Sequence, residues 1–121
     1  MTAALISIID DDESTRLALA GLMRSFGLVA KTYTSAEDFL RSGAGEPSSC
    51  IITDIHMPGL SGIELKRWLD DHANTAPVIM ITGRSEPHLL AQAQACGAVS
   101  LLRKPFDAEA LLACLKKAQI A

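Results

Sequence analysis

The sequence predicts an α/β domain with a doubly wound parallel sheet of five strands and five helices. Short, β-branched apolar runs alternate along the 121-residue chain with segments whose apolar residues recur at helical spacing. The run at residues 50–53 shows no polar alternation, which is typical of a strand buried on both faces of a sheet. Strands joined by helical crossovers at this spacing form a parallel sheet with helices on both faces.

Length and composition indicate one domain that spans residues 1–121. No apolar run approaches the length of a membrane span, roughly 20 residues, and the N-terminus lacks the features of a signal peptide. We therefore expect a soluble, cytoplasmic protein with no membrane contact. A net charge of −3 without a large basic cluster predicts no direct nucleic acid binding by this chain. The three cysteines lack metal-ligand spacing and are expected to be small core residues: Cys50, Cys96 and Cys114.

Four consecutive acids separate the first strand from the first helix. Leu5–Ile9 is predicted to be a buried strand, and the acids occupy residues 10–13. Asp12 and Glu13 favour the start of a helix, because carboxylates stabilise a helix N-terminus. Two of the four acids therefore remain for another role. We expect the helix to end at Gly27 and to bury Leu17, Ala20, Leu22, Met23 and Phe26.

The second strand, residues 28–33, leads into a short helix. Thr34 and Glu37 have the spacing of a capping box, and Ser35 is a further candidate for the cap. Residues 42–49 are rich in Gly, Ser and Pro, which indicates a surface loop. The short helix is expected to direct two apolar side chains inward, those of Phe39 and Leu40.

The middle of the chain holds an apolar run that ends in a single carboxylate. Residues 50–53 are predicted to be a strand buried on both faces, and the Pro and Gly residues within 58–62 prevent its continuation. Asp54 should therefore lie at the carboxyl end of a central strand, although a turn or helix-capping role is the alternative. A third helix should run to about Ala73, with His72 solvated near its end. Its core face is expected to be Ile63, Leu65, Trp68 and Leu69.

The fourth strand, residues 78–81, ends in Thr82, so a small polar side chain again follows a strand end. Pro87, preceded by Glu86, is predicted to start the fourth helix, because proline is favoured in the first turn. Gly97 is predicted to end it. The apolar face of this helix is expected to be Leu89, Leu90, Ala93 and Cys96.

The fifth strand, residues 98–102, is followed by Lys104. The bond from Lys104 to the proline after it is a candidate for cis geometry, which would direct the lysine across the strand ends. The last helix is predicted to start at Asp107 or Ala108 and to continue to about Gln119. Its buried residues are expected to be Leu111, Leu112 and Leu115.

Polar side chains follow four of the five predicted strands. The first ends in Asp10 and Asp11, the third in Asp54, the fourth in Thr82 and the fifth in Lys104. Because the carboxyl ends of parallel strands share one edge, we expect these side chains to lie together. Three neighbouring carboxylates repel one another unless a cation lies among them, and an oxygen-only set suits Mg2+. The sequence therefore predicts Mg2+ as the cofactor.

The same residues suit phosphoryl transfer. Asp54, on the middle strand, can act as a carboxylate nucleophile on phosphorus. The transferred group needs its oxygens neutralised, and Mg2+, the Lys104 ammonium and the Thr82 hydroxyl can supply this. Gly83 has no side chain and would let the backbone approach the phosphoryl group closely.

In order and spacing, these motifs resemble the receiver domain of two-component response regulators, and the resemblance covers essentially all 121 residues. It implies the CheY-like, flavodoxin-like fold with strand order 2-1-3-4-5. The motifs are the residues 9–12, Asp54 with Met57, Pro58 and Gly62, the pair Thr82 and Gly83, and the run Lys104, Pro105 and Phe106.

By this resemblance Asp54 is the phosphoacceptor and a sensor histidine kinase is the donor. The domain would not be an enzyme beyond phosphorylating itself from small donors and dephosphorylating itself. Asp11 and Asp54 would bind Mg2+ directly, Asp10 through water, and His56 through its main-chain carbonyl. Contacts to the phosphoryl group would come from Thr82 and Lys104.

Residues 35–40, 81–84 and 97–106 are similar to the FixJ subgroup, whose members usually carry a C-terminal helix-turn-helix domain. The resemblance therefore implies transcription regulation through an output domain absent from this chain, and a stand-alone receiver is the alternative.

The resemblance also identifies a candidate switch. Receivers of this kind usually have Phe or Tyr three residues before the lysine, where this chain has Leu101. We expect Thr82 and Leu101 to form the switch. Phosphorylation should then produce a homodimer through the fourth helix, the fifth strand and the fifth helix. The contact is expected to be an apolar patch of Leu89, Leu90 and Leu101, rimmed by Arg84, Arg103 and Lys117.

Two other classes of function use similar residues. A Mg2+-dependent phosphohydrolase of the haloacid dehalogenase type also has a nucleophilic aspartate, but such enzymes usually carry a second aspartate where this chain has His56. A pseudo-receiver would bind partners without phosphate, and the complete set of acids, threonine and lysine disfavours it. His56 and Arg84, two positions beyond Asp54 and Thr82, are expected to influence the lifetime of the phosphoryl group.

Overall fold

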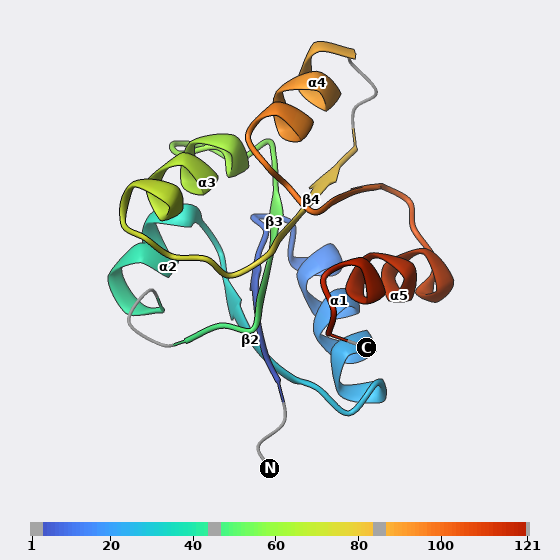
Figure 1. The fold of residues 1–121 in the computed structure, drawn as a ribbon. Helices are drawn as coiled ribbons and strands as arrows, with labels where there is room; N and C mark the ends of the chain where they lie inside the picture. The colour runs from blue at the N-terminus through green and yellow to red at the C-terminus, as the bar shows by residue number, and fades with distance from the viewer. Residues whose placement is uncertain (1–3, 44–46, 84–86, 121) are drawn as a thin grey trace.

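The structure is a computed structural model that describes residues 4–43, 47–83 and 87–120. It contains one parallel sheet (Figure 1), and the strand order is β2-β1-β3-β4-β5. Five helices connect and follow the strands, so the fold class and strand order predicted from the sequence are confirmed. The strands are β1 (Leu5–Ile9), β2 (Val29–Tyr33), β3 (Cys50–Asp54), β4 (Val78–Thr82) and β5 (Ser100–Arg103). The helices are α1 (Glu13–Ser25), α2 (Ala36–Ser42), α3 (Gly62–Asp71), α4 (Pro87–Ala95) and α5 (Ala108–Lys117).

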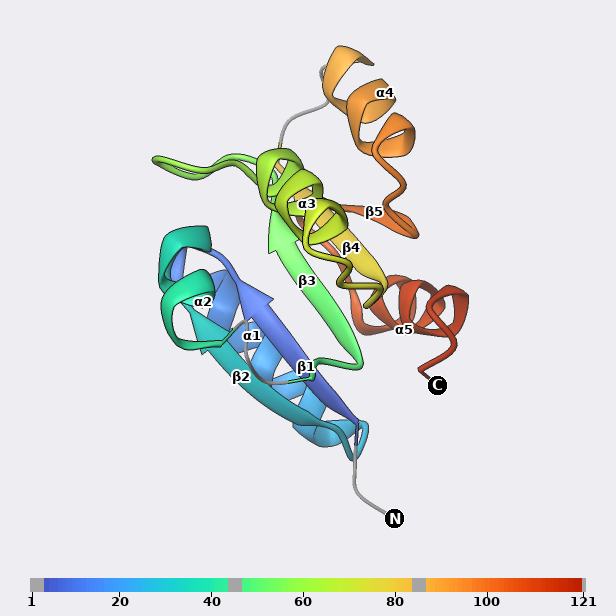
Figure 2. The same ribbon diagram turned by 60° about the vertical axis from the view of Figure 1, so that its left-hand side comes forward.

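Helices cover both faces of the sheet, as Figures 1 and 2 show from two directions. α1 and α5 pack on one face around a core that includes Leu19, Met23 and Leu111. α2, α3 and α4 pack on the other face around a second core that includes Phe39 and Leu69. All residues of β3 and β4 are buried. This burial explains why their sequences show no polar alternation.

The register of the sheet aligns the carboxyl ends of four strands. Ile9 of β1 lies beside Thr53 of β3, so the next residues in each strand, Asp10 and Asp54, come out at the same edge. Asp54 lies beside Ile81 of β4. The end of β4 lies in turn beside the end of β5. The polar residues that follow these strands are therefore held along one line.

Caps explain where the helices begin and end. The Asp12 side chain caps α1 by accepting a hydrogen bond from the Ser14 N–H, so the prediction that some of the four acids serve the helix is confirmed. Gly27 follows the end of α1 with φ of 79°, a conformation that favours glycine. At α3, Ser61 and Glu64 form a reciprocal capping box.

Several sequence predictions about side chains are corrected. Leu17 is 60% exposed and Leu19 is fully buried, because α1 turns its 19, 20 and 23 positions toward the sheet. In α5, Leu112 is only half-buried, while Cys114 lies in the core. The helix ends also shift by about two residues: α3 ends at Asp71 and α5 at Lys117. Glu86, predicted to precede α4, lies outside the described residues.

The expected capping box between Thr34 and Glu37 does not form. Ser35 caps α2 by accepting the N–H of Asp38. The carboxylate of Glu37 instead accepts a hydrogen bond from the Leu60 N–H, in the loop between β3 and α3.

The structure also describes His72 and the three cysteines. His72 is exposed as predicted, but its ring stacks on Trp68 with the centroids 3.7 Å apart. Cys50 and Cys114 are buried, and Cys96 is half-buried. Burial raises the pKa of the Cys50 thiol to about 12, so this thiol stays protonated near neutral pH.

Among the described residues, every helix is too short or too polar to cross a membrane.

Candidate functional site

Three carboxylates converge at the carboxyl edge of the sheet. Asp10, Asp11 and Asp54 each place one carboxylate oxygen within 4.8 Å of the others. Asp10 is fully buried and Asp54 is 5% exposed, whereas Asp11 is open to solvent. We call this group of two buried acids and one exposed acid the acidic pocket.

The two oxygens of Asp54 have different partners. Oδ1 accepts a hydrogen bond from the His56 N–H at 3.1 Å, which is the turn-stabilising contact that the sequence left as an alternative. Oδ2 accepts a hydrogen bond from the Lys104 ammonium at 3.0 Å. Asp54 therefore fixes the first turn of its own loop with one oxygen and keeps the other in the pocket.

Asp10 is held by its backbone as well as its side chain. Its N–H donates to the Tyr33 carbonyl at 3.1 Å, and its own carbonyl accepts from the Arg16 guanidinium at 2.8 Å. Oδ1 accepts from the Asp12 N–H at 2.9 Å. Burial raises the pKa of Asp10, and the nearby charge of Asp54 raises it further. The Asp12 N–H and the charge of Lys104 only partly offset these two effects.

Lys104 supplies the positive charge of the pocket. Its Nζ lies 3.0 Å from Asp54 Oδ2 and 3.2 Å from Asp10 Oδ2. Burial alone would lower the pKa of Lys104, but the hydrogen bond and charge of Asp54, together with Asp10, outweigh it and raise the pKa. The Lys104 N–H also donates to the Thr82 carbonyl at 2.8 Å, and the bond from Lys104 to Pro105 is cis, as suggested from the sequence.

The other predicted site residues surround this pocket. Thr82 is fully buried at the end of β4. Gly83 is exposed, and a Cβ placed on it would lie 3.8 Å from Lys104 Cδ, an ordinary contact. The His56 ring has a buried Nε2 with no hydrogen-bond partner among the described residues. Arg84, predicted beside the site, lies outside the described residues.

The donor set fits a hard divalent cation. All three side chains offer oxygen, and Asp10 Oδ2 is buried without a hydrogen-bond donor, although Lys104 is near it. An octahedral Mg2+ with ligands at about 2.1 Å separates its oxygens by roughly 3–4 Å, and the three carboxylate oxygens all lie within 4.8 Å of one another. The acidic pocket is therefore compatible with Mg2+ binding, which would also relieve the repulsion between the carboxylates.

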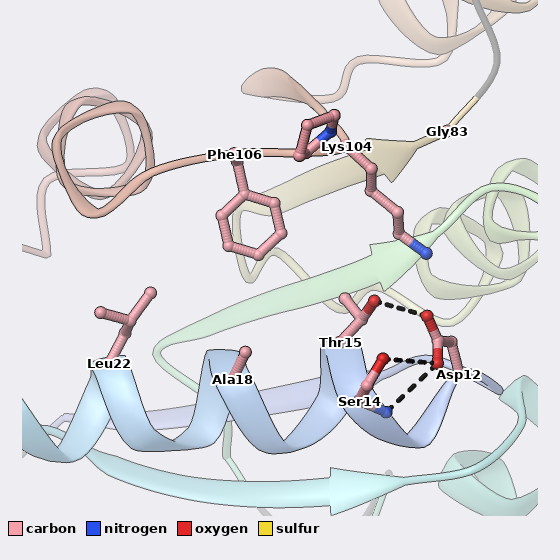
Figure 3. Close-up of a pocket in the computed structure, with 9 residues that line it drawn as sticks. Asp12, Ser14, Thr15, Ala18, Leu22, Gly83, Lys104 and Phe106 are labelled. Carbon is pink, nitrogen blue, oxygen red and sulfur yellow. Dashed lines mark hydrogen bonds between the residues drawn. The ribbon is translucent and has the colours of Figure 1, made fainter.

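A cavity of about 500 Å³ opens beside the pocket, between α1 and the loop from β5 to α5 (Figure 3). Lys104 and Asp12 lie at its polar end. Its apolar wall is formed by Ala18, Leu22 and Phe106, and the Phe106 ring points toward α1. Sequence patterns do not indicate this cavity, because its walls come from separate elements.

A parallel five-stranded sheet with an acidic pocket and a lysine at its carboxyl edge defines a CheY-like α/β domain. The sequence model of the response regulator receiver domain matches residues 6–116, and the chain belongs to this family.

Relatives and solved structures support the same assignment. The chain is 40% identical over 111 residues to the transcriptional regulatory protein FixJ of Azorhizobium caulinodans. The aligned segment covers 92% of this chain and 53% of the relative. It is 35% identical over 116 residues to the response regulator TodT of Pseudomonas putida, which covers 96% of this chain and 51% of the relative. The chain thus spans about half the length of these curated relatives.

The FixJ-N crystal structure superposes with a TM-score of 0.88 at 33% identity, covering 98% of this chain and 94% of that one. The chemotaxis protein CheY4 of Vibrio cholerae gives a TM-score of 0.89 at 25% identity, covering 97% of this chain and 99% of that one. The chain is therefore a receiver domain of the two-component systems, similar to FixJ and TodT.

Proposed function

We propose that this receiver domain, the single unit of residues 1–121, accepts a phosphoryl group on Asp54 from the phosphohistidine of a sensor histidine kinase. The observation that carries the proposal is the placement of Asp54 Oδ2, which lies 3.0 Å from Lys104 Nζ in the pocket shared with Asp10 and Asp11. The Asp54 oxygen forms a bond to phosphorus while the phosphorus–nitrogen bond breaks. The histidine nitrogen keeps the electron pair and takes a proton from solvent water.

Each residue of the pocket has a separate part in this step. Mg2+, held by Asp10, Asp11, Asp54 and the main-chain carbonyl of His56, would supply positive charge to the phosphoryl oxygens. Lys104 is already charged and close to Asp54, so it can exchange its contact with Oδ2 for one with the phosphoryl group. The Thr82 hydroxyl and the backbone at Gly83 complete the phosphoryl-binding residues.

The direct test uses acetyl phosphate as a small donor. With Mg2+, intact-protein mass spectrometry should show one added phosphoryl group, and with EDTA it should show none. A phosphohydrolase, the alternative class, would instead release phosphate through many turnovers without slow self-dephosphorylation between them. Continuous release of phosphate from p-nitrophenyl phosphate would favour that class.

Mg2+ should stabilise the folded protein even without a phosphoryl donor. An ion that binds only the native state shifts unfolding by mass action, and at tenfold excess over its dissociation constant the gain is about 1.4 kcal/mol. For a domain of this size the gain corresponds to several degrees in Tm. Thermal unfolding with Mg2+ and with EDTA measures it. An unchanged Tm would contradict Mg2+ binding by Asp10, Asp11 and Asp54.

This stabilisation should depend on pH, because the pKa of Asp10 is raised in the folded state. Without Mg2+, Asp10 favours the folded state below its raised pKa, and this contribution is lost as the pH rises through that value. Mg2+ binds the ionised carboxylate, so it competes with the proton. The rise in Tm caused by Mg2+ should therefore be larger at about pH 7.5 than at about pH 5.

We infer that phosphorylation is read out on the surface formed by α4, β5 and α5. This surface has a hollow of about 260 Å³ whose wall includes Leu101 and Lys117. Leu101 is half-buried and packs against the core on the α4 side of the sheet, so movement of Thr82 toward the phosphoryl group can change its packing. Leu89 is buried in that core and does not belong to the surface patch expected from the sequence. Arg84, expected at the rim, lies outside the described residues.

Beryllofluoride, which mimics the phosphoryl group, should convert the monomer to a dimer. Leu101 buries less area than an aromatic ring, so the shift should be modest, on the order of 1–3 kcal/mol. Light scattering with and without beryllofluoride measures the mass, and NMR shifts at α4 report the repacking. A monomer in both conditions, with no shifts at α4, would place the switch on another surface.

The output is proposed from the relatives. FixJ is named a transcriptional regulatory protein, and the chain covers about half of it. We propose a cytoplasmic response regulator that controls transcription through a DNA-binding domain outside this chain, while the receiver itself makes no nucleic acid contact. A stand-alone receiver is the alternative. The sequence of the encoding gene beyond the codon for Ala121 distinguishes the two.

A further inference from the structure

Glu37 joins α2 to the loop between β3 and α3. Its Oε2 accepts the Leu60 N–H at 3.0 Å, although the two residues are 23 positions apart in the sequence. Gly59 has φ of 79°, and a Cβ on it would collide with the same Glu37 oxygen. The loop and the carboxylate thus fit closely, and the Leu60 N–H lowers the pKa of Glu37, so the side chain is ionised near neutral pH.

This loop carries the backbone beside the acidic pocket. Its hydrogen bonds include His56 N–H to Asp54 Oδ1, Ser61 N–H to the Glu64 carboxylate and Gly62 N–H to the Ile55 carbonyl. Those three bonds lie within residues 54–64. The bond from Leu60, the residue before the α3 cap Ser61, to Glu37 instead ties the α3 end of the loop to a different element. At the β3 end, the Ile55 N–H donates to the Ile81 carbonyl of β4 at 2.9 Å, so without Glu37 the described bonds would tie the loop to another element only at that end.

We propose that Glu37 is a positioning residue for the phosphorylation site: it holds the β3–α3 loop so that the His56 main chain stays beside the acidic pocket. The inference rests on the proposed function. It also makes α2 a part of the site, because a shift of α2 would move the anchor of the loop. Groups behind the direct ligands commonly tune metal affinity by orienting those ligands.

An experiment can distinguish the positioning role of Glu37 from a purely local role in α2. Glu37 lies in the first turn of α2, where any carboxylate stabilises the helix N-terminus. Asp38 lies in the same turn and has the same charge, but its carboxylate pairs with Arg41 at 3.4 Å. Asp38→Ala therefore reproduces the loss of charge near the helix terminus without removing the contact to the loop.

The experiment compares Glu37→Ala, Glu37→Gln and Asp38→Ala. Amide hydrogen exchange reports the Leu60 N–H directly, and calorimetry gives the dissociation constant of Mg2+. Glu37→Ala should speed exchange at Leu60 about tenfold or more and weaken Mg2+ binding about 3- to 10-fold, less than the loss of a group bonded to a ligand side chain. Glu37→Gln keeps an oxygen acceptor and should stay within about twofold of the wild type. Asp38→Ala should also stay within about twofold of the wild type.

The outcomes are distinguishable. Equal losses of Mg2+ affinity in Glu37→Ala and Asp38→Ala would overturn the positioning role, because surface charge alone would then explain the effect. Unchanged exchange at Leu60 in Glu37→Ala would overturn it too. Failure of the wild type to bind Mg2+ would overturn the proposed function and this inference together. Thermal unfolding of the variants shows that each remains folded.

Discussion

Asp54→Asn is expected to abolish phosphoryl incorporation from acetyl phosphate and Mg2+. An amide oxygen carries no negative charge and cannot act as the nucleophile on phosphorus. The shape of the side chain is kept, and the asparagine oxygen can still accept the His56 N–H, so the loop geometry should persist. The pocket loses one of its two contacts to Lys104. Intact-protein mass spectrometry should show no added phosphoryl group.

Asp12→Asn is the matched control for this variant. Asp12 carries the same charge close to the pocket, but its carboxylate caps α1 through Ser14 and Thr15. Asparagine caps helices as well as aspartate does, so the fold should be unaffected. Labelling of Asp12→Asn should match that of the wild type. Labelling of Asp54→Asn at the wild-type level would show that another residue is the phosphoacceptor.

The sequence predicted which residues lie together because parallel topology aligns strand ends. β3 and β4 begin as apolar runs and end in Asp54 and Thr82, so the polar residues mark the strand ends. Once the strands are parallel, their polar neighbours must meet at one edge, whatever the details of packing. Asp10 could be separated from Asp12 because helix capping accounts for Asp12. Topology and capping rules thus sufficed to group the residues of the pocket.

Predictions from the sequence were wrong where a side chain could make more than one local contact. Leu17 and Leu19 both fit an apolar helical face, and only the contact with the sheet decides that Leu19 is buried. Glu37 fits a capping box with Thr34, but the nearby loop offers the Leu60 N–H as a better partner. Arg16 was not identified, although it binds the Asp10 carbonyl. Contacts between separate elements carry no signal in periodicity or spacing.

The sequence also does not show which glycines the fold requires and which could be replaced by a residue with a side chain. Gly62 is buried at the start of α3, and a Cβ on it would collide with the Asp54 carbonyl oxygen and lie 3.1 Å from Ile55 Cα. Gly21, within α1, has no atom within 4 Å of the position of a Cβ apart from its chain neighbours and the backbone of its own helix. The two positions therefore predict opposite effects for the same substitution.

Gly62→Ala is expected to destabilise the protein by about 1–3 kcal/mol, because the colliding atoms belong to the backbone and can move only with the end of β3. Gly21→Ala is expected to stabilise it by about 0.5–1 kcal/mol, because alanine is the better residue in a helix interior. Urea unfolding of both variants measures the two free energies. A change of the same sign in both would contradict the collision at Gly62.

The collision at Gly62 should also slow the phosphorylation of Asp54. The Asp54 carbonyl belongs to the residue that would accept the phosphoryl group, so displacing it moves the nucleophile relative to Lys104 and Asp10. A misplacement of about 1 Å in a reacting group can slow a step by on the order of 100-fold. Gly62→Ala should therefore label much more slowly with acetyl phosphate at temperatures where it is fully folded, while Gly21→Ala labels at the wild-type rate. Equal labelling rates for the two folded variants would show that β3 absorbs the added methyl group without moving Asp54.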